Sequence, residues 1–271
     1  MTSIRPAAVA GLFYPRNPDT LLREVQGYIK QAAPPDRLDI IPRALIAPHA
    51  GYAYSGPIAG TAYTCWKRLA PSIRRVLLIG PAHRAPLVGI AACHATAFAT
   101  PLGSLPVDQT TLTRWTDEKR VIWHDEAHAE EHGLEVHCPF LQHLCPDIEL
   151  VPLVVGQADP ADVASLLADA LKPSDTYAVI SSDLSHYYDY ATARRRDQAT
   201  AEAITTGDIT LLDGDCACGY VPIQGLLHWA QAHVAHCELL DLRSSGDTAG
   251  SRDRVVGYGA FACGPACAPL T

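Results

Sequence analysis

The chain has 271 residues, of which 48% are hydrophobic and 18% are charged, and its formal net charge is −8. This composition excludes a disordered tail or a long exposed coiled coil, because charged residues fall below the usual quarter. The acidic balance, with Arg194–Arg196 as the single short basic run, argues against nucleic acid as a partner. No apolar stretch reaches the roughly 20 residues that span a bilayer, and residues 1–17 do not resemble a signal peptide, so we expect a cytoplasmic protein without membrane contact.

Short apolar runs alternate with helical patterns along the whole chain. The expected helices cover residues 18–32, 57–69, 108–117, 131–144, 160–171, 190–206 and 221–233. The expected strands cover residues 44–48, 75–80, 88–92, 149–155, 177–182, 236–242 and 255–261, and the last two are close enough to form an antiparallel hairpin. Continuous apolar strands separated by helices indicate a sheet that is covered on both faces. We therefore predict one α/β domain over residues 1–271, a sandwich with a central mixed, largely parallel sheet covered by helices.

The nine cysteines are scattered, and several lie in apolar segments where cysteine behaves as a small hydrophobic residue. Their number is odd and a chain of this size needs no disulfide framework, so we expect no disulfide bonds. Cys263 and Cys267 lie near the C-terminus and are interpreted as structural or incidental.

Polar residues follow three of the expected strands directly. His49 follows the first strand, His83 follows the second, and Asp183 and His186 follow the fifth. In open α/β sheets, ligands bind in the crevice beyond the carboxyl ends of the strands, where such residues converge. We therefore expect these side chains to share one pocket.

A catalytic metal ion needs about three protein ligands and one open position. His49 and His83 supply two of them, and the third could be Asp183 or Cys218. Cys218 precedes an expected helix, whose N-terminus favours a thiolate. The alternative is that Cys216 and Cys218 are simply buried small residues.

The segment from His124 to His137 holds four histidines but misses the zinc-protease patterns, because its glutamates are wrongly spaced. We expect His124 and His128 to lie on a solvated acidic helix start. His132 and Glu135 could face the pocket. Tyr52 and Tyr54 could line the pocket or serve in ordinary loop packing.

Eight motifs together resemble the Memo family, which includes protein B of the AmmeMemoRadiSam system, and the resemblance covers nearly the whole chain. They are R-PAAVAG-FYP (5–15), PHAGYAYSG (48–56), IGPAH (79–83), EHGLEVHCPFLQ (131–142), SSDLSHY (181–187), CG (218–219), SSGD (244–247) and VVGYGAF (255–261). The family is similar in fold to the class III extradiol dioxygenases, which use non-haem iron in an α/β sandwich. The resemblance implies that fold here.

The resemblance also implies roles for individual residues. His49 and His83 would be the histidine ligands of the metal, and Cys218 would stand where the dioxygenases have a carboxylate ligand. His186 would act as an acid or base, with Asp183 beside it in the pocket. His132 would be a further catalytic residue, and it matches a family segment in which serine is usual at the next position, where this chain has Gly133. Many members also carry a second histidine where this chain has Arg84.

Three functions follow as hypotheses. The first is a metal-dependent oxidoreductase, with Fe(II) as the first choice and copper as the second, in which the open positions of the metal serve substrate and O₂. The second is a non-catalytic module that binds a peptide or a small molecule. The third is a zinc hydrolase, with Asp183 or Glu135 as the base. The substrate is not specified, and the family resemblance suggests a pathway link to a radical-SAM protein.

Overall fold

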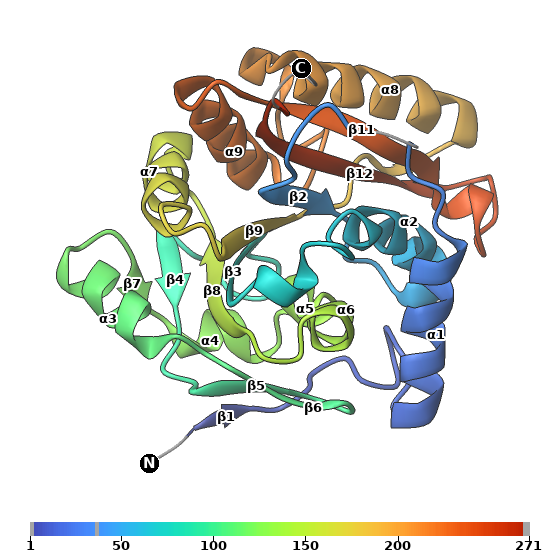
Figure 1. Ribbon diagram of the computed structural model, residues 1–271. Coiled ribbons are helices and arrows are strands. Elements are labelled where there is room, and N and C mark those ends of the chain that lie inside the picture. The colour runs from blue at the N-terminus through green and yellow to red at the C-terminus, as the bar shows by residue number, and fades with distance from the viewer. Residues whose placement is uncertain (1–2, 36–37, 268–271) are drawn as a thin grey trace.

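The structure, a computed structural model, describes residues 3–35 and 38–267. A nine-stranded mixed sheet forms its centre, in the order β10-β12-β2-β9-β3-β8-β4-β7, and β11 pairs with β12 (Figure 1). Its strands are β2 (Ala44–Ala47), β3 (Arg75–Pro81), β4 (Ile90–Ala92), β7 (Ile122–Trp123), β8 (Glu149–Val155), β9 (Thr176–Ser181), β10 (His186–Tyr188), β11 (Ala235–Ser244) and β12 (Val255–Pro265).

Four neighbouring strands at the centre of the sheet, β2, β9, β3 and β8, run parallel. The flanking pairs β12–β2, β11–β12 and β4–β8 are antiparallel. Every residue of β2 and β9 is buried, which explains why these strands are continuous apolar runs. The prediction of a mixed sheet with a parallel centre is confirmed, and so is the antiparallel hairpin of the last two strands.

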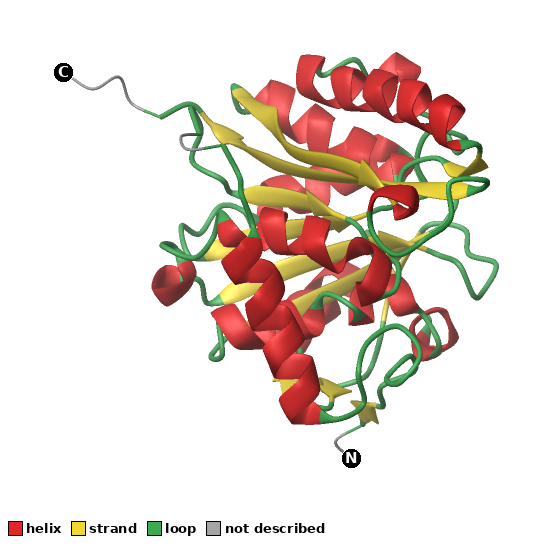
Figure 2. Cartoon of the chain, turned by 90° about the vertical axis from the view of Figure 1, so that its right-hand side faces the viewer, coloured by secondary structure: helices red, strands yellow, loops and turns green. Residues whose placement is uncertain are grey.

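Helices cover both faces of the sheet. The helices are α1 (Pro18–Gln31), α2 (Tyr52–Thr64), α3 (Gln109–Asp117), α4 (Asp125–Ala129), α5 (His132–Glu135), α6 (Cys138–Leu144), α7 (Pro160–Ala170), α8 (Tyr190–Thr206) and α9 (Tyr220–Ala232). Helices α1, α2 and α6 pack together on one side of the sheet, and α7 and α9 pack together on the other (Figure 1 and Figure 2). No helix in residues 3–35 and 38–267 is long and apolar enough to cross a membrane.

Two of the expected helices differ from the structure. Helix α2 begins at Tyr52, five residues before its predicted start, and carries Pro57 inside rather than at its first turn. The helix expected over 131–144 is two helices, α5 and α6, with Pro139 in the first turn of the second. Proline lacks the N–H that would continue the earlier helix, so the chain turns before it. This break separates His132 from the residues of α6.

A second, three-stranded sheet was not expected from the sequence. It contains β1 (Ile4–Arg5), β5 (Ala97–Thr100) and β6 (Gly103–Pro106), in the order β1-β5-β6. These strands are short and only partly buried, so they lack the apolar runs that identify the central strands. The pairing of β1 with β5 fixes the N-terminal segment to the rest of the domain.

Two expectations are wrong, one about the cysteines and one about His128. Cys237 and Cys263 form a disulfide between β11 and β12, because they occupy directly facing positions of the antiparallel pair. Disulfides are rare in cytosolic proteins, so this bond weighs against the cytoplasmic location, which stays a prediction. His128 is 2% exposed rather than solvated, because its Nε2 bonds the Ala91 carbonyl oxygen at 3.0 Å.

The strand order explains why residues distant in sequence meet. Strand β9 lies between β2 and β3 and runs parallel to both. The carboxyl ends of the three strands therefore lie side by side at one edge of the sheet. His49 follows β2, His83 follows β3, and Asp183 follows β9.

Candidate metal centre

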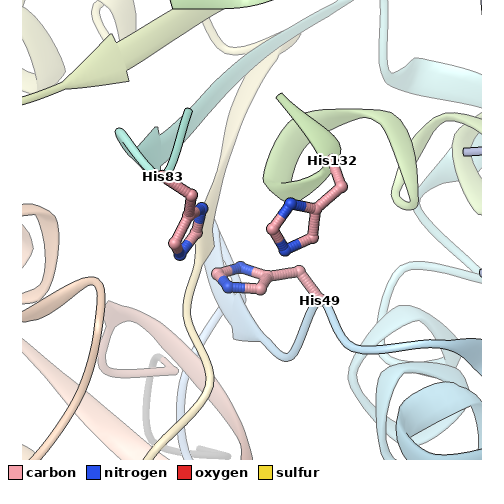
Figure 3. A group of neighbouring side chains, drawn as sticks. All are labelled: His49, His83 and His132. Carbon is pink, nitrogen blue, oxygen red and sulfur yellow. The ribbon is translucent and has the colours of Figure 1, made fainter. Parts of the chain in front are cut away.

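Three imidazole rings meet at this edge of the sheet. One ring nitrogen of each of His49, His83 and His132 lies within 4.8 Å of the others, and the rings point toward one another (Figure 3). His49 and His83 come from the ends of β2 and β3, and His132 begins the short helix α5. The expected meeting of His49 and His83 is observed, and His132 joins them.

A hydrogen-bond network fixes the tautomer of His49. The single hydroxyl hydrogen of Ser181 is donated to the Gly133 carbonyl oxygen. Ser181 Oγ can therefore only accept from the two ring nitrogens beside it, His49 Nδ1 at 2.6 Å and His137 Nε2 at 2.9 Å. Both nitrogens carry hydrogen, and Tyr63 donates to the remaining nitrogen of His137 at 3.0 Å. A neutral His49 consequently keeps a lone pair on Nε2, on the side of the pocket.

Glu131 has the same effect on His83. Its Oε1 lies 2.8 Å from His83 Nδ1, and its Oε2 accepts the backbone N–H of His83 at 2.7 Å. Gly133 donates its backbone N–H to the same carboxylate at 2.8 Å. Burial alone would raise the pKa of Glu131, but these hydrogen bonds hold it below its usual value. A carboxylate behind a histidine is the usual support of a metal-binding imidazole, since it orients the ring and leaves Nε2 free.

His132 packs between the other two rings and the N-terminal segment. Its ring centroid lies 4.7 Å from that of His83 and 4.8 Å from that of Phe13. Its Nδ1 is buried without a hydrogen-bond partner in the described part of the chain. A β-carbon at Gly133 would lie 3.1 Å from Glu131 Oε1, so the glycine leaves room for the carboxylate.

Cys218 lies against His49, just before α9. Its Sγ is 3.3 Å from His49 Nε2, and the backbone N–H of Asp183 points to it at 3.3 Å. Two donors of one tetrahedral ion at ordinary bond lengths lie about 3.5 Å apart, so Cys218 and His49 are spaced as two such donors. Burial raises the pKa of the thiol to about 12, so the thiolate expected from the helix N-terminus is not favoured without a metal. The role of Cys218 as third ligand stays a prediction.

Asp183 and His186 line the same cavity, of about 600 Å³, as the three histidines. Asp183 is 4% exposed and accepts the backbone N–H of His49 at 2.8 Å. Burial raises its pKa to about 7, which places its titration in the range useful for proton transfer. Burial lowers the pKa of His186, which is therefore neutral at pH 7 and able to accept a proton.

Of the three further residues that the sequence suggested for the pocket, Tyr54 lines it, and Tyr52 and Glu135 do not. Tyr54 lines the cavity, whereas Tyr52 is buried and donates its hydroxyl to the Val136 carbonyl oxygen at 2.7 Å. Glu135 does not face the cavity. Its carboxylate pairs with Arg5 at 2.6 Å and is 1% exposed, so it cannot serve as the base of a hydrolase.

The donor set fits a transition-metal ion. Burial lowers the pKa of His49 well below its usual value and that of His132 to about 4, so both are neutral at pH 7, as metal ligands must be. Imidazole nitrogen suits Zn, Cu, Fe and Ni. Three imidazoles with an adjacent thiol and a supporting carboxylate form a site that could hold one such ion.

Sequence reasoning did not identify Glu131, Ser181 and His137 as parts of the site. All three are buried polar residues. Glu131 contacts Nδ1 of His83, Ser181 contacts Nδ1 of His49, and His137 contacts the hydroxyl of Ser181. Glu131 directly precedes His132, and Ser181 ends β9, so their positions beside predicted site residues were the available signal. Which atom each of them contacts depends on the folded chain.

The fold and the site define an α/β protein with a histidine-lined pocket at the carboxyl ends of its parallel strands. The family model described as "Memo-like protein" matches residues 5–262, and the chain belongs to the Memo family. A MEMO1 family protein of Methanothermobacter thermautotrophicus is 33% identical, over 94% of this chain and 98% of that relative. One of Archaeoglobus fulgidus is 34% identical, over 94% of this chain and 97% of that relative.

Proposed function

We propose that this protein binds one divalent transition-metal ion at the histidine cluster and is a metal-dependent oxidoreductase, with iron as the first choice and copper as the second. The convergence of His49, His83 and His132 within 4.8 Å carries the proposal. Cys218, 3.3 Å from His49 Nε2, is the neighbouring donor that the family resemblance favours as a ligand. When bound, such an ion supplies open coordination positions and redox chemistry.

The protein's own side chains would supply the rest of the chemistry. Ser181 and Glu131 keep hydrogen on the Nδ1 atoms of His49 and His83, so that each Nε2 can donate to the ion. His186 and Asp183 line the cavity. Burial lowers the pKa of His186, so its neutral ring can accept a proton, and Asp183, whose pKa burial raises to about 7, can accept or release one close to neutral pH. The substrate, a small molecule or a peptide, would enter through the same cavity.

A zinc hydrolase is the second candidate, because Asp183 places a carboxyl group in the cavity. With its pKa raised to about 7, Asp183 would be partly ionised at neutral pH and could take a proton from water. This function predicts zinc in the site and activity that does not depend on oxygen.

Metal content of the anaerobically purified protein tests both candidates. The variants are His83→Ala, His132→Ala and Cys218→Ser, and the control is His94→Ala, a histidine on the surface that pairs with Asp125. We expect about one iron or copper per chain, retained in His94→Ala and lost in His83→Ala. Loss in His132→Ala but not in Cys218→Ser would make His132 the third ligand, and the reverse would make it Cys218.

The metal found then decides the assay. Iron or copper leads to a screen for oxygen uptake, and zinc favours the hydrolase. A protein that takes up no metal after reconstitution would contradict both candidates, and would leave a module that binds a peptide or a small molecule without catalysis.

A further inference from the structure

A cation without an acidic partner lines the cavity of the histidine cluster. Arg254 precedes β12, its side chain is exposed, and its guanidinium lies over the ring of Tyr187, 5.3 Å from the ring centroid. None of the ion pairs among the described residues includes it. Arg252, two residues earlier and outside the cavity, does have a partner, since it lies 3.7 Å from Asp247.

The charge inside the cavity is unlike that of the whole chain. The formal net charge is −8, yet among the described residues that line the cavity Asp183 is the single carboxylate. That carboxylate is 4% exposed and already accepts the backbone N–H of His49. Arg84, exposed and directly after His83, likewise takes part in none of the described ion pairs. Arg84 does not line the cavity, whereas Arg254 does, and in an acidic protein an arginine left unpaired at a cavity is available to an anion from solution.

Flat rings form the apolar part of the same cavity. Phe13, Tyr54 and Tyr258 line it, and Phe13 packs on His132. Aromatic walls of this kind bind flat apolar bodies by stacking and edge contacts. The cavity, of about 600 Å³, is within the range of small-molecule sites.

We propose that the cavity takes a small molecule with a flat apolar body and one anionic group, a carboxylate or a phosphate. Arg254 binds the anionic group, and the body packs against Phe13 and Tyr54, so that the molecule lies beside the histidine cluster. This inference rests on the proposed metal centre and names the class of substrate for it. Arg254 sets the specificity, because a neutral analogue of the same shape would leave its guanidinium unpaired.

Calorimetric titration tests the inference with four probes of related shape. They are benzoate, phenyl phosphate, the neutral benzamide, and acetate, which lacks the ring. Each is titrated into metal-reconstituted and metal-free protein, as wild type, Arg254→Met and the matched control Arg252→Met. Running the metal-free form separates binding at Arg254 from direct binding of an anion to the metal.

We expect benzoate or phenyl phosphate to bind at least about 10-fold more tightly than benzamide and acetate, the difference expected of a charge-assisted hydrogen bond. The preference over benzamide should persist without metal, disappear in Arg254→Met and remain in Arg252→Met. The better of the two anions identifies the carboxylate or the phosphate. Equal binding of benzoate and benzamide, no effect of Arg254→Met, or no binding of any probe would overturn the inference. Metal content, measured on the same samples, reports on the metal centre separately.

Discussion

Two glutamates of one short segment, four residues apart and each with a 1% exposed side chain, have opposite surroundings. Glu131 contacts the histidine cluster, through the ring and backbone of His83 and the backbone of Gly133. Glu135 contacts the N-terminal segment and pairs with the buried guanidinium of Arg5. The difference teaches that burial alone does not identify a functional carboxylate, and that the bonded partner does.

The partners of Glu135 form an anchor for the first part of the chain. Its carboxylate accepts from Arg5 at 2.6 Å, from the backbone of Ala8 and Val9 at 2.7 and 2.9 Å, and from the Tyr14 hydroxyl at 2.5 Å. This anchor holds the backbone on both sides of Phe13, a residue that lines the cavity. Glu135 therefore affects the site only through the position of the N-terminal segment.

Removing the charge of Glu135 should have the largest effect on stability. In Glu135→Gln the buried guanidinium of Arg5 loses its anion, which we expect to lower the free energy of unfolding by about 3–5 kcal/mol. Urea unfolding measures the loss, and Glu130→Gln, an exposed position in the same segment, should change little. If Glu135→Gln kept its stability but lost metal, the roles that we assign to the two glutamates would be wrong.

Asp197 extends the comparison to a buried carboxylate that forms no ion pair among the described residues. It is 3% exposed, accepts the backbone N–H of Ser185 at 3.0 Å and takes part in none of the described ion pairs. Burial raises its pKa from 3.8 to about 6, so the folded state binds the proton more tightly than the unfolded state. Its contribution is therefore favourable below about pH 4 and is lost as the pH rises to about 6.

The replacement Asp197→Asn should remove that pH dependence. Above pH 6 the wild type carries a cost of at most about 2–3 kcal/mol from the buried charge, so the variant should be more stable at pH 8 and about equal at pH 4. Urea unfolding at intervals between the two pH values checks the slope. A variant that is less stable than wild type at pH 8 would show that the ionised carboxylate is stabilised by its surroundings.

The sequence was most informative where apolar residues form an unbroken run. Continuous apolar runs located β2, β3, β8 and β9, and the residues directly after three of these strands marked the pocket, because parallel strands must end at one edge. The short strands of the small sheet, half buried, carry no such pattern. Cys237 and Cys263 gave no signal either, since only the register of β11 against β12 brings them face to face.

The supporting residues of the site were harder to predict for a physical reason. Glu131 and Glu135 occupy the same acidic stretch, and nothing local separates the one that contacts His83 from the one that contacts Arg5. Both partners come from segments far away in the sequence. The sequence therefore indicated histidines at strand ends, but not the hydrogen bonds that set their tautomers.

Removing the charge of Glu131 tests the other half of the comparison. Glu131→Gln weakens the hydrogen bond to His83 Nδ1. Loss of such a supporting carboxylate typically costs about 10–100-fold in metal affinity. Competition with a chelator measures the affinity, and the Co²⁺ absorption spectrum reports the ligand geometry. The control Glu126→Gln lies at an exposed position. Unchanged affinity in Glu131→Gln would show that His83 is oriented by other contacts or is not a ligand.

The smallest effect is expected from Phe13→Leu. This variant tests whether the N-terminal segment supports the site through the aromatic ring of Phe13 or only through the position of its backbone, which Glu135 anchors. Leucine keeps the backbone carbonyl that accepts from the Tyr52 N–H at 2.7 Å, and replaces a ring 4.8 Å from that of His132. We expect a loss of stability of about 1 kcal/mol or less and a change in metal affinity below about 3-fold. Leu12→Ala, at a side chain that is 81% exposed, is the control. A larger loss of metal affinity would mean that the Phe13 ring itself holds His132 in place. The N-terminal segment, which Glu135 anchors, would then be part of the site, and Glu135 as well as Glu131 would affect metal binding.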